Sequence, residues 1–501
     1  KQGNMKEKTQ VPDNMRQVLE IMEENLKGRR VFRYITEDCT DVQDKSAEEF
    51  FDDVRVAAKV LYRRGLAGRH IGITGRNSYS WMVALCAVFW SGSVAVLIDR
   101  EISPKELAAR VEQAEISGLI FEGGLRENVR EASFPRDLVL LENEEMRKEA
   151  ENCDQETARY REKRMDELAC IFFTSGTTGR SKAVMMSERG LAAGICHRIQ
   201  SRKFRALLAV LPFHHLAGFS SVLNALYLGA EVCLGGNPGY FYRYLEAMKP
   251  DYVFVVPSML RLLVRKLRNG GPNGRLLGWD LHMINCGGAT FRPEFLQMLL
   301  DRNITVLQGY GASEAGAIGF LWEMTADRPD TIGKPPEGLE VRIVDGELWL
   351  RSASVMMGYY RDSEETQRVL KEGWYITGDL CRQDEDGYLY LTGRKKNLII
   401  LSNGENVSPE EIEGRLCRGG DILESVVYAR EDQLAVFIYP REAPEEQKES
   451  VREKIQHAVE DYNESVPLYK QIKKVEFMEK PPERTSSGKL QRRSMQEGKK
   501  E

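Results

Sequence analysis

The sequence has no apolar stretch long enough to cross a membrane. Its main apolar run, Met82 to Trp90, is about half of the ~20 residues that a membrane-spanning helix needs. This run therefore predicts a buried helix and no membrane span. The first ten residues are polar and charged without an apolar core, so we expect no secretory signal in the chain as given.

The sequence also has no large excess of charge of either sign. Its 71 Lys and Arg residues nearly balance 76 Asp and Glu residues, which gives a formal net charge of -5. A protein that binds nucleic acid as its main partner usually carries a basic field. We therefore expect no nucleic-acid partner.

Metal-binding and disulfide patterns are missing as well. The nine cysteines include no CxxC pair, and most lie among apolar residues, which is typical of reduced thiols in a cytoplasmic protein. Among the six histidines, His214 and His215 form one close pair without a carboxylate or cysteine at ligand spacing. A structural metal site is not expected.

What the sequence does contain is a repeated alternation of strands and helices. The first unit runs from a helix over 46–65 to a strand at 118–121, and its alternation predicts a mostly parallel sheet covered on both faces. Residues 122–166 are charged and poorly periodic, and we expect connections and a surface helix there. A second α/β unit follows, with strands expected at 206–211, 230–234, 252–256, 283–286 and 305–308.

The pattern of predicted secondary structure changes after Gly333. Short alternating strands and turn pairs such as Asp345-Gly346 predict a small β subdomain. The last hundred or so residues have the length of a small independent domain. The predicted fold is thus α/β, with a large N-terminal domain of two α/β layered subdomains plus a small β subdomain, followed by a small α+β C-terminal domain.

Residues 171–182 form the stretch richest in chemistry. An apolar strand runs directly into glycines, hydroxyls and Lys182, a composition that suits a phosphate because turned backbone N–H groups, hydroxyls and one cation can surround it. The spacing of Gly176, Gly179 and Lys182 does not match the Walker pattern GxxxxGK[ST]. On this stretch alone, an ordinary turn remains an equal alternative.

Five further motifs occur with it in a fixed order: Gly287-Gly288-Ala289, residues 308–314 (QGYGASE), residues 374–379 (WYITGD), residues 393–413 (GRKKNLIILSNGENVSPEEIE) and residues 482–490 (PERTSSGKL). Together the six stretches resemble the AMP-forming adenylating enzymes, which include acyl-CoA and aryl-CoA synthetases, adenylation domains of peptide synthetases, and luciferases. The resemblance covers about residues 40–495.

The resemblance implies an ATP site. It places the ATP phosphates against residues of the first motif: Thr174, Ser175, Gly176, Thr177, Thr178 and Lys182. Tyr310 would stack on adenine, and the flanking small residues would allow close backbone approach: Gly288, Ala289, Gly309 and Gly311. Ser313 would contribute a hydroxyl, and Glu314 would bind Mg²⁺ between phosphate oxygens. Asp379 and Arg394 would hold the ribose.

The resemblance also implies a mobile C-terminal domain. Residues 1–395 would form the N-terminal domain, and residues 396–501 would turn about a hinge at Lys396. Lys489 would neutralise the transition state of adenylate formation, and the turn around Gly404 would line the thiol tunnel in a second pose. The family joins an activated acid to a thiol, so coenzyme A, or the phosphopantetheine of an acyl or peptidyl carrier protein, is the expected acceptor.

The acid site is expected after Pro212. The resemblance assigns it to His214, His215, Phe219, Gly287 and Ala312, and either histidine could gate it. Leu223 and Leu226 are further candidate walls. Amino-acid-activating relatives place an aspartate shortly after this point, whereas this sequence has no carboxylate from Pro212 to Gly229. The prediction is a fatty or aromatic acid without an α-amino group; a non-catalytic nucleotide-binding protein is the alternative of a different class.

Overall fold

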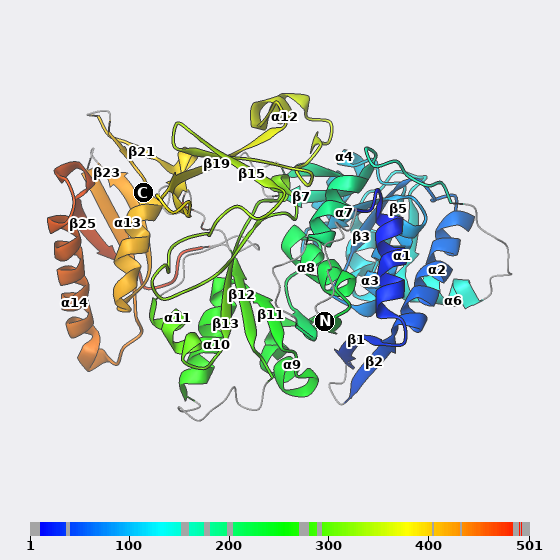
Figure 1. Cartoon of the computed structure of the whole chain (residues 1–501), viewed down its shortest axis with the longest axis horizontal. Helices are drawn as coiled ribbons and strands as arrows, with labels where there is room; N and C mark the ends of the chain where they lie inside the picture. The colour runs from blue at the N-terminus through cyan, green and yellow to red at the C-terminus, as the bar shows by residue number, and fades with distance from the viewer. Residues whose placement is uncertain are drawn as a thin grey trace, which may run out of the picture.

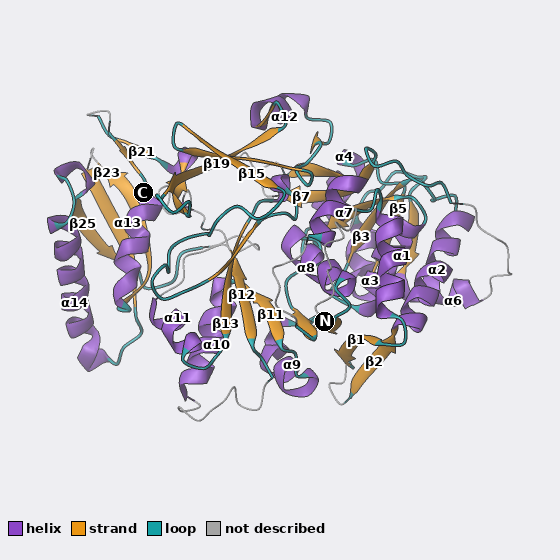
Figure 2. Ribbon diagram, in the orientation of Figure 1, coloured by secondary structure: helices purple, strands orange, loops and turns teal. Residues whose placement is uncertain are grey.

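A computed structural model shows the architecture (Figure 1). It describes residues 11–36, 41–151, 160–174, 181–197, 204–269, 280–287, 293–402, 405–430, 433–483, 490 and 492. Two sheets with helices between and around them, a small β subdomain and a C-terminal α+β part follow one another along the chain (Figure 2). The predicted α/β class and its large and small parts are confirmed.

The first sheet has seven strands in the order β17-β8-β7-β4-β3-β5-β6. Strands β7 to β6 of this order are parallel, whereas β8 and β17 are antiparallel to their neighbours. Their bounds are β3 His70–Thr74, β4 Val94–Ile98, β5 Gly118–Phe121, β6 Val139–Glu142, β7 Leu168–Thr174, β8 Lys182–Ser187 and β17 Gly358–Tyr359. Strand β6 corrects the expectation of only connections and a helix over 122–166.

Sequence signals for helix starts hold in this part of the chain. Helices α2 (Ala47–Arg63) and α4 (Pro104–Gln113) each begin after a serine in a capping box, Ser46 with Glu49 and Ser103 with Glu106. The remaining helices here are α3 (Tyr79–Trp90), α5 (Arg126–Glu131) and α6 (Asn143–Glu151).

The second sheet has eight strands in the order β14-β13-β12-β11-β9-β10-β1-β2. Its bounds are β1 Arg30–Ile35, β2 Val42–Ser46, β9 Ala206–Ala209, β10 Glu231–Leu234, β11 Tyr252–Val255, β12 Met283–Gly287, β13 Thr305–Tyr310 and β14 Phe320–Glu323. Strands β1 and β2, which the sequence did not predict, complete a sheet whose other strands lie beyond residue 200. Helices α9 (Phe241–Met248), α10 (Pro257–Asn269) and α11 (Pro293–Leu300) belong to this unit.

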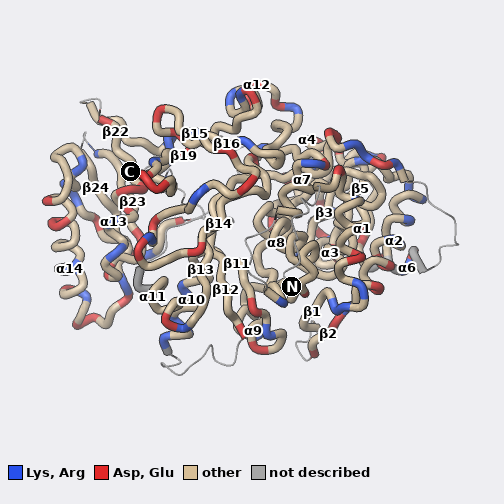
Figure 3. Tube along the Cα trace, viewed as in Figure 1, with Lys and Arg blue, Asp and Glu red and all other residues tan. Residues whose placement is uncertain are grey.

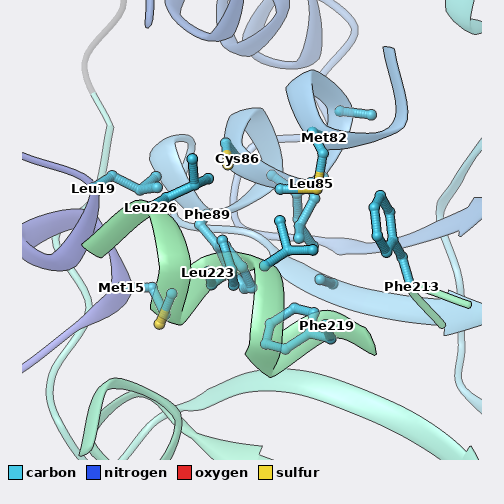
Figure 4. Packing of buried hydrophobic residues seen from close by; sticks show 14 of the residues in the cluster. Met15, Leu19, Met82, Leu85, Cys86, Phe89, Phe213, Phe219, Leu223 and Leu226 are labelled. Carbon is cyan, nitrogen blue, oxygen red and sulfur yellow. The ribbon is translucent and has the colours of Figure 1, made fainter. Parts of the chain in front are cut away.

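A helical layer joins the two sheets. Helices α1 (Met15–Leu26), α3, α7 (Glu188–Cys196) and α8 (Leu216–Tyr227) contact one another and contain much of the largest buried apolar cluster. Figure 4 shows Met15 and Leu19 of α1, Leu85 of α3, and Leu223 of α8 within this cluster. The buried run Met82 to Trp90 lies in α3, as predicted.

The β subdomain and the C-terminal part complete the chain. The subdomain contains β15 Leu339–Val344, β16 Glu347–Ser352, β18 Leu370–Lys371, β19 Trp374–Gln383, β20 Leu389–Arg394 and the helix α12 Ser363–Val369. The C-terminal part contains β21 Ile399–Ile400, β22 Asn406–Val407, α13 Pro409–Leu416, β23 Ile422–Arg430, β24 Gln433–Pro440, α14 Glu445–Glu464 and β25 Ile472–Phe477.

Charge is distributed without a single dominant sign. Figure 3 shows acidic and basic residues interspersed along the chain, including along α14. Within the described ranges, no helix is both long and apolar enough to span a bilayer.

Candidate active site

The phosphate stretch lies between β7 and β8 of the first sheet. Thr174 ends β7, Lys182 begins β8, and the two residues are paired across the strands. The Ser181 hydroxyl donates to the Thr174 carbonyl at 2.9 Å and closes the base of the connection. The predicted phosphate residues Ser175, Gly176, Thr177 and Thr178 lie outside the described residues. Their flanks are therefore fixed on adjacent strands of the sheet.

Lys182 already has an anionic partner. Its ammonium group forms an ion pair with Glu365 of α12 and lies 4.9 Å from the centroid of the Tyr359 ring. Arg368 donates to the same Glu365 oxygen at 2.5 Å. The positive charge proposed for phosphate binding is thus held at a defined place by a carboxylate and an aromatic face.

Glu314 lies in a short 3₁₀ turn, Ser313–Ala315, directly after β13. The Tyr359 hydroxyl donates to Glu314 Oε1 at 3.0 Å, and the Glu314 carbonyl accepts from the Met356 N–H at 2.9 Å. The turn requires glycine at its end: Gly316 has φ of 76°, and a Cβ there would be 1.8 Å from the Ser354 carbonyl oxygen. Tyr359 therefore contacts both side chains: its ring faces Lys182, and its hydroxyl donates to Glu314.

Asp379, Tyr310 and Arg394, which were predicted to bind the nucleoside, form one cluster. The Tyr310 hydroxyl donates to Asp379 Oδ2 at 2.7 Å, and Arg394 Nε lies 2.8 Å from Asp379 Oδ1. Burial, followed by the charge of Asp379, raises the pKa of Tyr310 well above its ordinary value. Tyr310 is therefore a neutral hydrogen-bond donor to the Asp379 side chain.

Tyr375 lies among these groups. Burial raises the pKa of Tyr375 well above its ordinary value, and the nearby charges of Glu314 and Asp379 raise it further. Sequence reasoning quoted Tyr375 only as a motif letter and did not single out Tyr359. Both are buried tyrosines beside carboxylates, and local sequence carries no signal for that arrangement.

The paired histidines precede helix α8. Their ring centroids are 4.2 Å apart, and His214 Nε2 lies 3.6 Å from Asp99 Oδ2 at the end of β4. Burial and the neighbouring His215 lower the pKa of His214 to about 4, although Asp99 opposes this. His214 is neutral at pH 7. Asp99, 115 positions before His214 in the sequence, was missed because only the residues after Pro212 were considered.

Close packing holds this histidine turn in place. The Asn77 side-chain amide donates to the Leu211 carbonyl at 2.8 Å and accepts from the Phe213 N–H at 3.0 Å. A Cβ at Gly218 would be 2.3 Å from the Pro212 carbonyl oxygen, so helix α8 can approach the turn this closely only with glycine there.

The apolar residues predicted as walls of the acid site are buried among the helices that join the two sheets. Phe219 is 1% exposed, and its ring packs 5.2 Å from that of Phe172 and 6.3 Å from that of Phe89. Leu223 and Leu226 are fully buried in the same cluster, beside residues of α1 and α3 (Figure 4). These contacts place all three side chains in the apolar core of the helical layer.

The remaining predicted residues are distributed as follows. Gly287 ends β12 and pairs with Gly309 of β13, and Gly311 and Ala312 follow β13. Lys396 lies in a 3₁₀ turn, Lys395–Asn397, between β20 and β21, where Lys395 binds Glu347 at 2.9 Å. Gly288, Ala289, Gly404 and Lys489 lie outside the described residues.

Models of known families match most of the chain. The family described as AMP-binding enzyme matches residues 23–360, and the AMP-binding enzyme C-terminal domain matches residues 396–498.

Similar curated proteins carry the names of CoA ligases. A 2-succinylbenzoate–CoA ligase of Bacillus cytotoxicus is 26% identical over 468 residues, which cover 89% of this chain and 91% of that protein. The peroxisomal OPC-8:0-CoA ligase 1 of Arabidopsis thaliana is 26% identical over 492 residues, with 91% and 89% coverage.

Solved structures share the fold. An anthranilate CoA ligase in complex with anthranoyl-AMP superposes with a TM-score of 0.81 at 18% identity, covering 96% of each chain. The O-succinylbenzoate coenzyme A synthetase of Bacillus subtilis, in complex with ATP and magnesium ion, superposes with a TM-score of 0.77 at 22% identity, covering 96% of this chain and 99% of that one.

Proposed function

The chain belongs to the AMP-binding enzyme family, and on this premise we propose that it activates a carboxylic acid with ATP and transfers the acyl group to the thiol of coenzyme A. The observation that supports this best is the convergence of Lys182, Glu314 and Asp379, which lie on separate segments, around the buried tyrosines Tyr359 and Tyr375. The names of the curated relatives support coenzyme A as the thiol.

Two steps make up the proposed reaction. In the first, a carboxylate oxygen of the acid attacks the α-phosphorus of ATP, the bond from that phosphorus to the bridging oxygen breaks, and pyrophosphate leaves with the electron pair. In the second, the thiol sulfur attacks the acyl carbonyl, AMP leaves, and the thiol proton is released. The first step concentrates negative charge on phosphate, so fixed cations near the leaving group lower its barrier.

The charged residues divide between the two ends of the nucleotide. Lys182 would hold the departing pyrophosphate, and Asp379, fixed by Tyr310 and Arg394, would accept the ribose hydroxyls. Lys489 would meet the α-phosphate and the acid. We place the domain boundary after Lys395, so that the following domain, with Lys396 as its hinge, carries Lys489.

The residues present fit a magnesium ion that arrives with the nucleotide. Glu314 binds Tyr359 through Oε1, and no hydrogen bond to its Oε2 is seen within the described residues. In that part of the chain no group of three or more His, Cys, Asp or Glu residues could hold a metal ion. One carboxylate plus phosphate oxygens is a common magnesium site. The bound ion would neutralise phosphate charge, and Glu314 would orient it.

The environment of the histidine turn supports an acid without an α-amino group. His214 is neutral, and Asp99 beside it already accepts the Glu101 N–H at 3.0 Å. We propose that a fatty or aromatic acid binds here, with His214, His215, Gly287 and Ala312 around it.

Acid-dependent exchange of pyrophosphate into ATP tests the proposal. The full chain is assayed with a panel of fatty, aromatic and amino acids, and the active acid is then supplied with coenzyme A or with a phosphopantetheinylated carrier protein. We expect exchange with a fatty or aromatic acid and acyl-CoA as product. Acyl transfer only to the carrier would identify a carrier-loading enzyme. ATP binding without exchange on any acid would identify a non-catalytic nucleotide-binding protein.

A further inference from the structure

A short segment, residues 356–369, runs alongside β8, the strand that begins with Lys182. The segment, which we name the strap, contains β17 and α12. The Met357 N–H donates to the Met185 carbonyl at 2.8 Å, and the Tyr360 N–H donates to the Ala183 carbonyl at 2.8 Å. The strap is therefore an extension of the first sheet and is held in register with Lys182.

Glu365 of the strap forms an ion pair with Lys182, the lysine proposed to bind phosphate. The Glu365 side chain is 18% exposed, and one of its oxygens, Oε1, accepts from both Lys182 and Arg368. Burial opposes ionisation, but the hydrogen bonds from Arg368 and Lys182 hold the pKa of Glu365 below its usual range. One carboxylate oxygen between two cations resembles the contact that a phosphate oxygen would make.

The same segment also contacts Glu314. Tyr359 of β17 packs its ring against Lys182 and donates its hydroxyl to Glu314. The strap thus contacts two of the charged groups that the proposed reaction needs, Lys182 for phosphate and Glu314 for magnesium.

We propose that Glu365 is an internal counter-anion that the phosphates of ATP replace on Lys182, so that Glu365 sets the affinity of the site for polyphosphate. This inference rests on the proposed function. Glu365 and the phosphates of an incoming nucleotide compete for the same ammonium group, that of Lys182.

Arg368 makes the exchange feasible. Breaking an ion pair is costly when it leaves a buried charge without a partner. Glu365 and Arg368 are three positions apart on α12, and the Arg368 side chain is 69% exposed. After Lys182 turns to phosphate, Glu365 keeps a cation of its own helix.

The test compares nucleotide binding by the wild type and Glu365→Gln, which removes the charge but keeps the size of the side chain. Dissociation constants of ATP, pyrophosphate and adenosine are measured by calorimetry on the full chain. We expect ATP and pyrophosphate to bind roughly fivefold more tightly, because a competing ion pair worth about 1 kcal/mol is removed. Adenosine, which has no phosphate, should bind unchanged.

Two controls identify the origin of the effect. Glu112→Gln changes the net charge equally on an exposed position of α4 and should leave all three constants unchanged. In a Lys182→Met background, Glu365→Gln should change ATP affinity by less than about twofold, since the competition has been removed. The tightening should also shrink as salt is raised.

Several results would overturn the inference. Weaker ATP binding by Glu365→Gln would mean that the carboxylate supports Lys182, and an unchanged constant would mean that no competition exists. Loss of adenosine binding as well, repeated in Glu365→Ala, would identify a purely structural pair. These outcomes require a wild type that binds ATP. A wild type that does not bind ATP would instead refute the proposed function.

Discussion

Replacing Lys163 with methionine should destabilise the N-terminal domain strongly. Lys163 and Glu188 form a buried ion pair with a distance of 3.1 Å from Nζ to Oε1, and their side chains are only 9% and 3% exposed. Lys163 also donates to the carbonyls of Ser93 and Leu168, and Glu188 accepts from the Met15 N–H at 2.8 Å. The pair therefore ties helix α1 to β7 and α7.

Removing one partner of a buried pair leaves an uncompensated charge, which costs about 3–5 kcal/mol. With a urea m-value of about 3 kcal/mol/M, the unfolding midpoint of this domain should fall by about 1–1.7 M at pH 7. Arg164→Met changes the neighbouring residue, whose side chain is 73% exposed, and should shift the midpoint by less than about 0.2 M.

The loss should also depend on pH. Burial raises the pKa of Glu188 above its ordinary value even with Lys163 present, and the substitution should raise it further. A carboxyl group with a raised folded pKa favours the native state below its unfolded pKa and loses that contribution as pH rises through the folded pKa. The deficit of Lys163→Met should therefore be smaller at pH 5 than at pH 7.

Urea denaturation of the single variants and of Lys163→Met/Glu188→Gln completes the experiment. The double variant should be more stable than Lys163→Met alone, because it no longer buries an unpaired carboxylate. A deficit below about 1 kcal/mol at pH 7, or one that is equal at pH 5 and pH 7, would refute this reasoning.

Three further predictions concern the site. Lys489→Ala should abolish adenylate formation but leave acyl transfer from preformed acyl-AMP largely intact; single-turnover assays that show equal loss of both steps would contradict domain alternation. Asp379→Asn should raise KM for ATP roughly ten- to a hundredfold, because a charge-assisted contact is lost, while binding of free pyrophosphate stays within about twofold; an equal loss of both would place Asp379 outside the ribose site. His214 has a folded pKa of about 4, below its unfolded value, so wild-type stability should rise from pH 4 to 6.5, and His214→Gln should reduce this rise in urea denaturation; an unchanged slope would contradict the assignment.

Local sequence predicted the elements of the fold better than their partners. Periodic apolar segments and capping serines indicated the alternation of strands and helices. Strand β2 was not predicted because its residues are mostly polar and exposed. It forms by antiparallel pairing with β1. The membership of β1 in the sheet built from residues beyond 200 is a long-range fact that no local pattern encodes.

The site shows the same division. The motifs led to Lys182, Glu314, Tyr310 and Asp379, and the structure brings the last two into direct contact. The carboxylates that contact predicted site residues lie in segments without a motif of their own. Examples are Asp99 beside His214 and Glu365 beside Lys182. Such contacts depend on how distant segments pack, which a single sequence does not contain.

The polar contacts between the two parts of the chain have a kinetic consequence. Two ion pairs join residues before position 396 to residues after it: Arg261 with Glu424 at 3.4 Å, and Arg418 with Asp330 at 2.5 Å. Each pair has at least one partly exposed side chain. Pairs of this kind contribute at most about 1 kcal/mol each and weaken in salt. A rotation of the C-terminal domain that breaks them would meet only a small barrier from this interface, so turnover limited by that rotation should become faster, not slower, at moderate ionic strength.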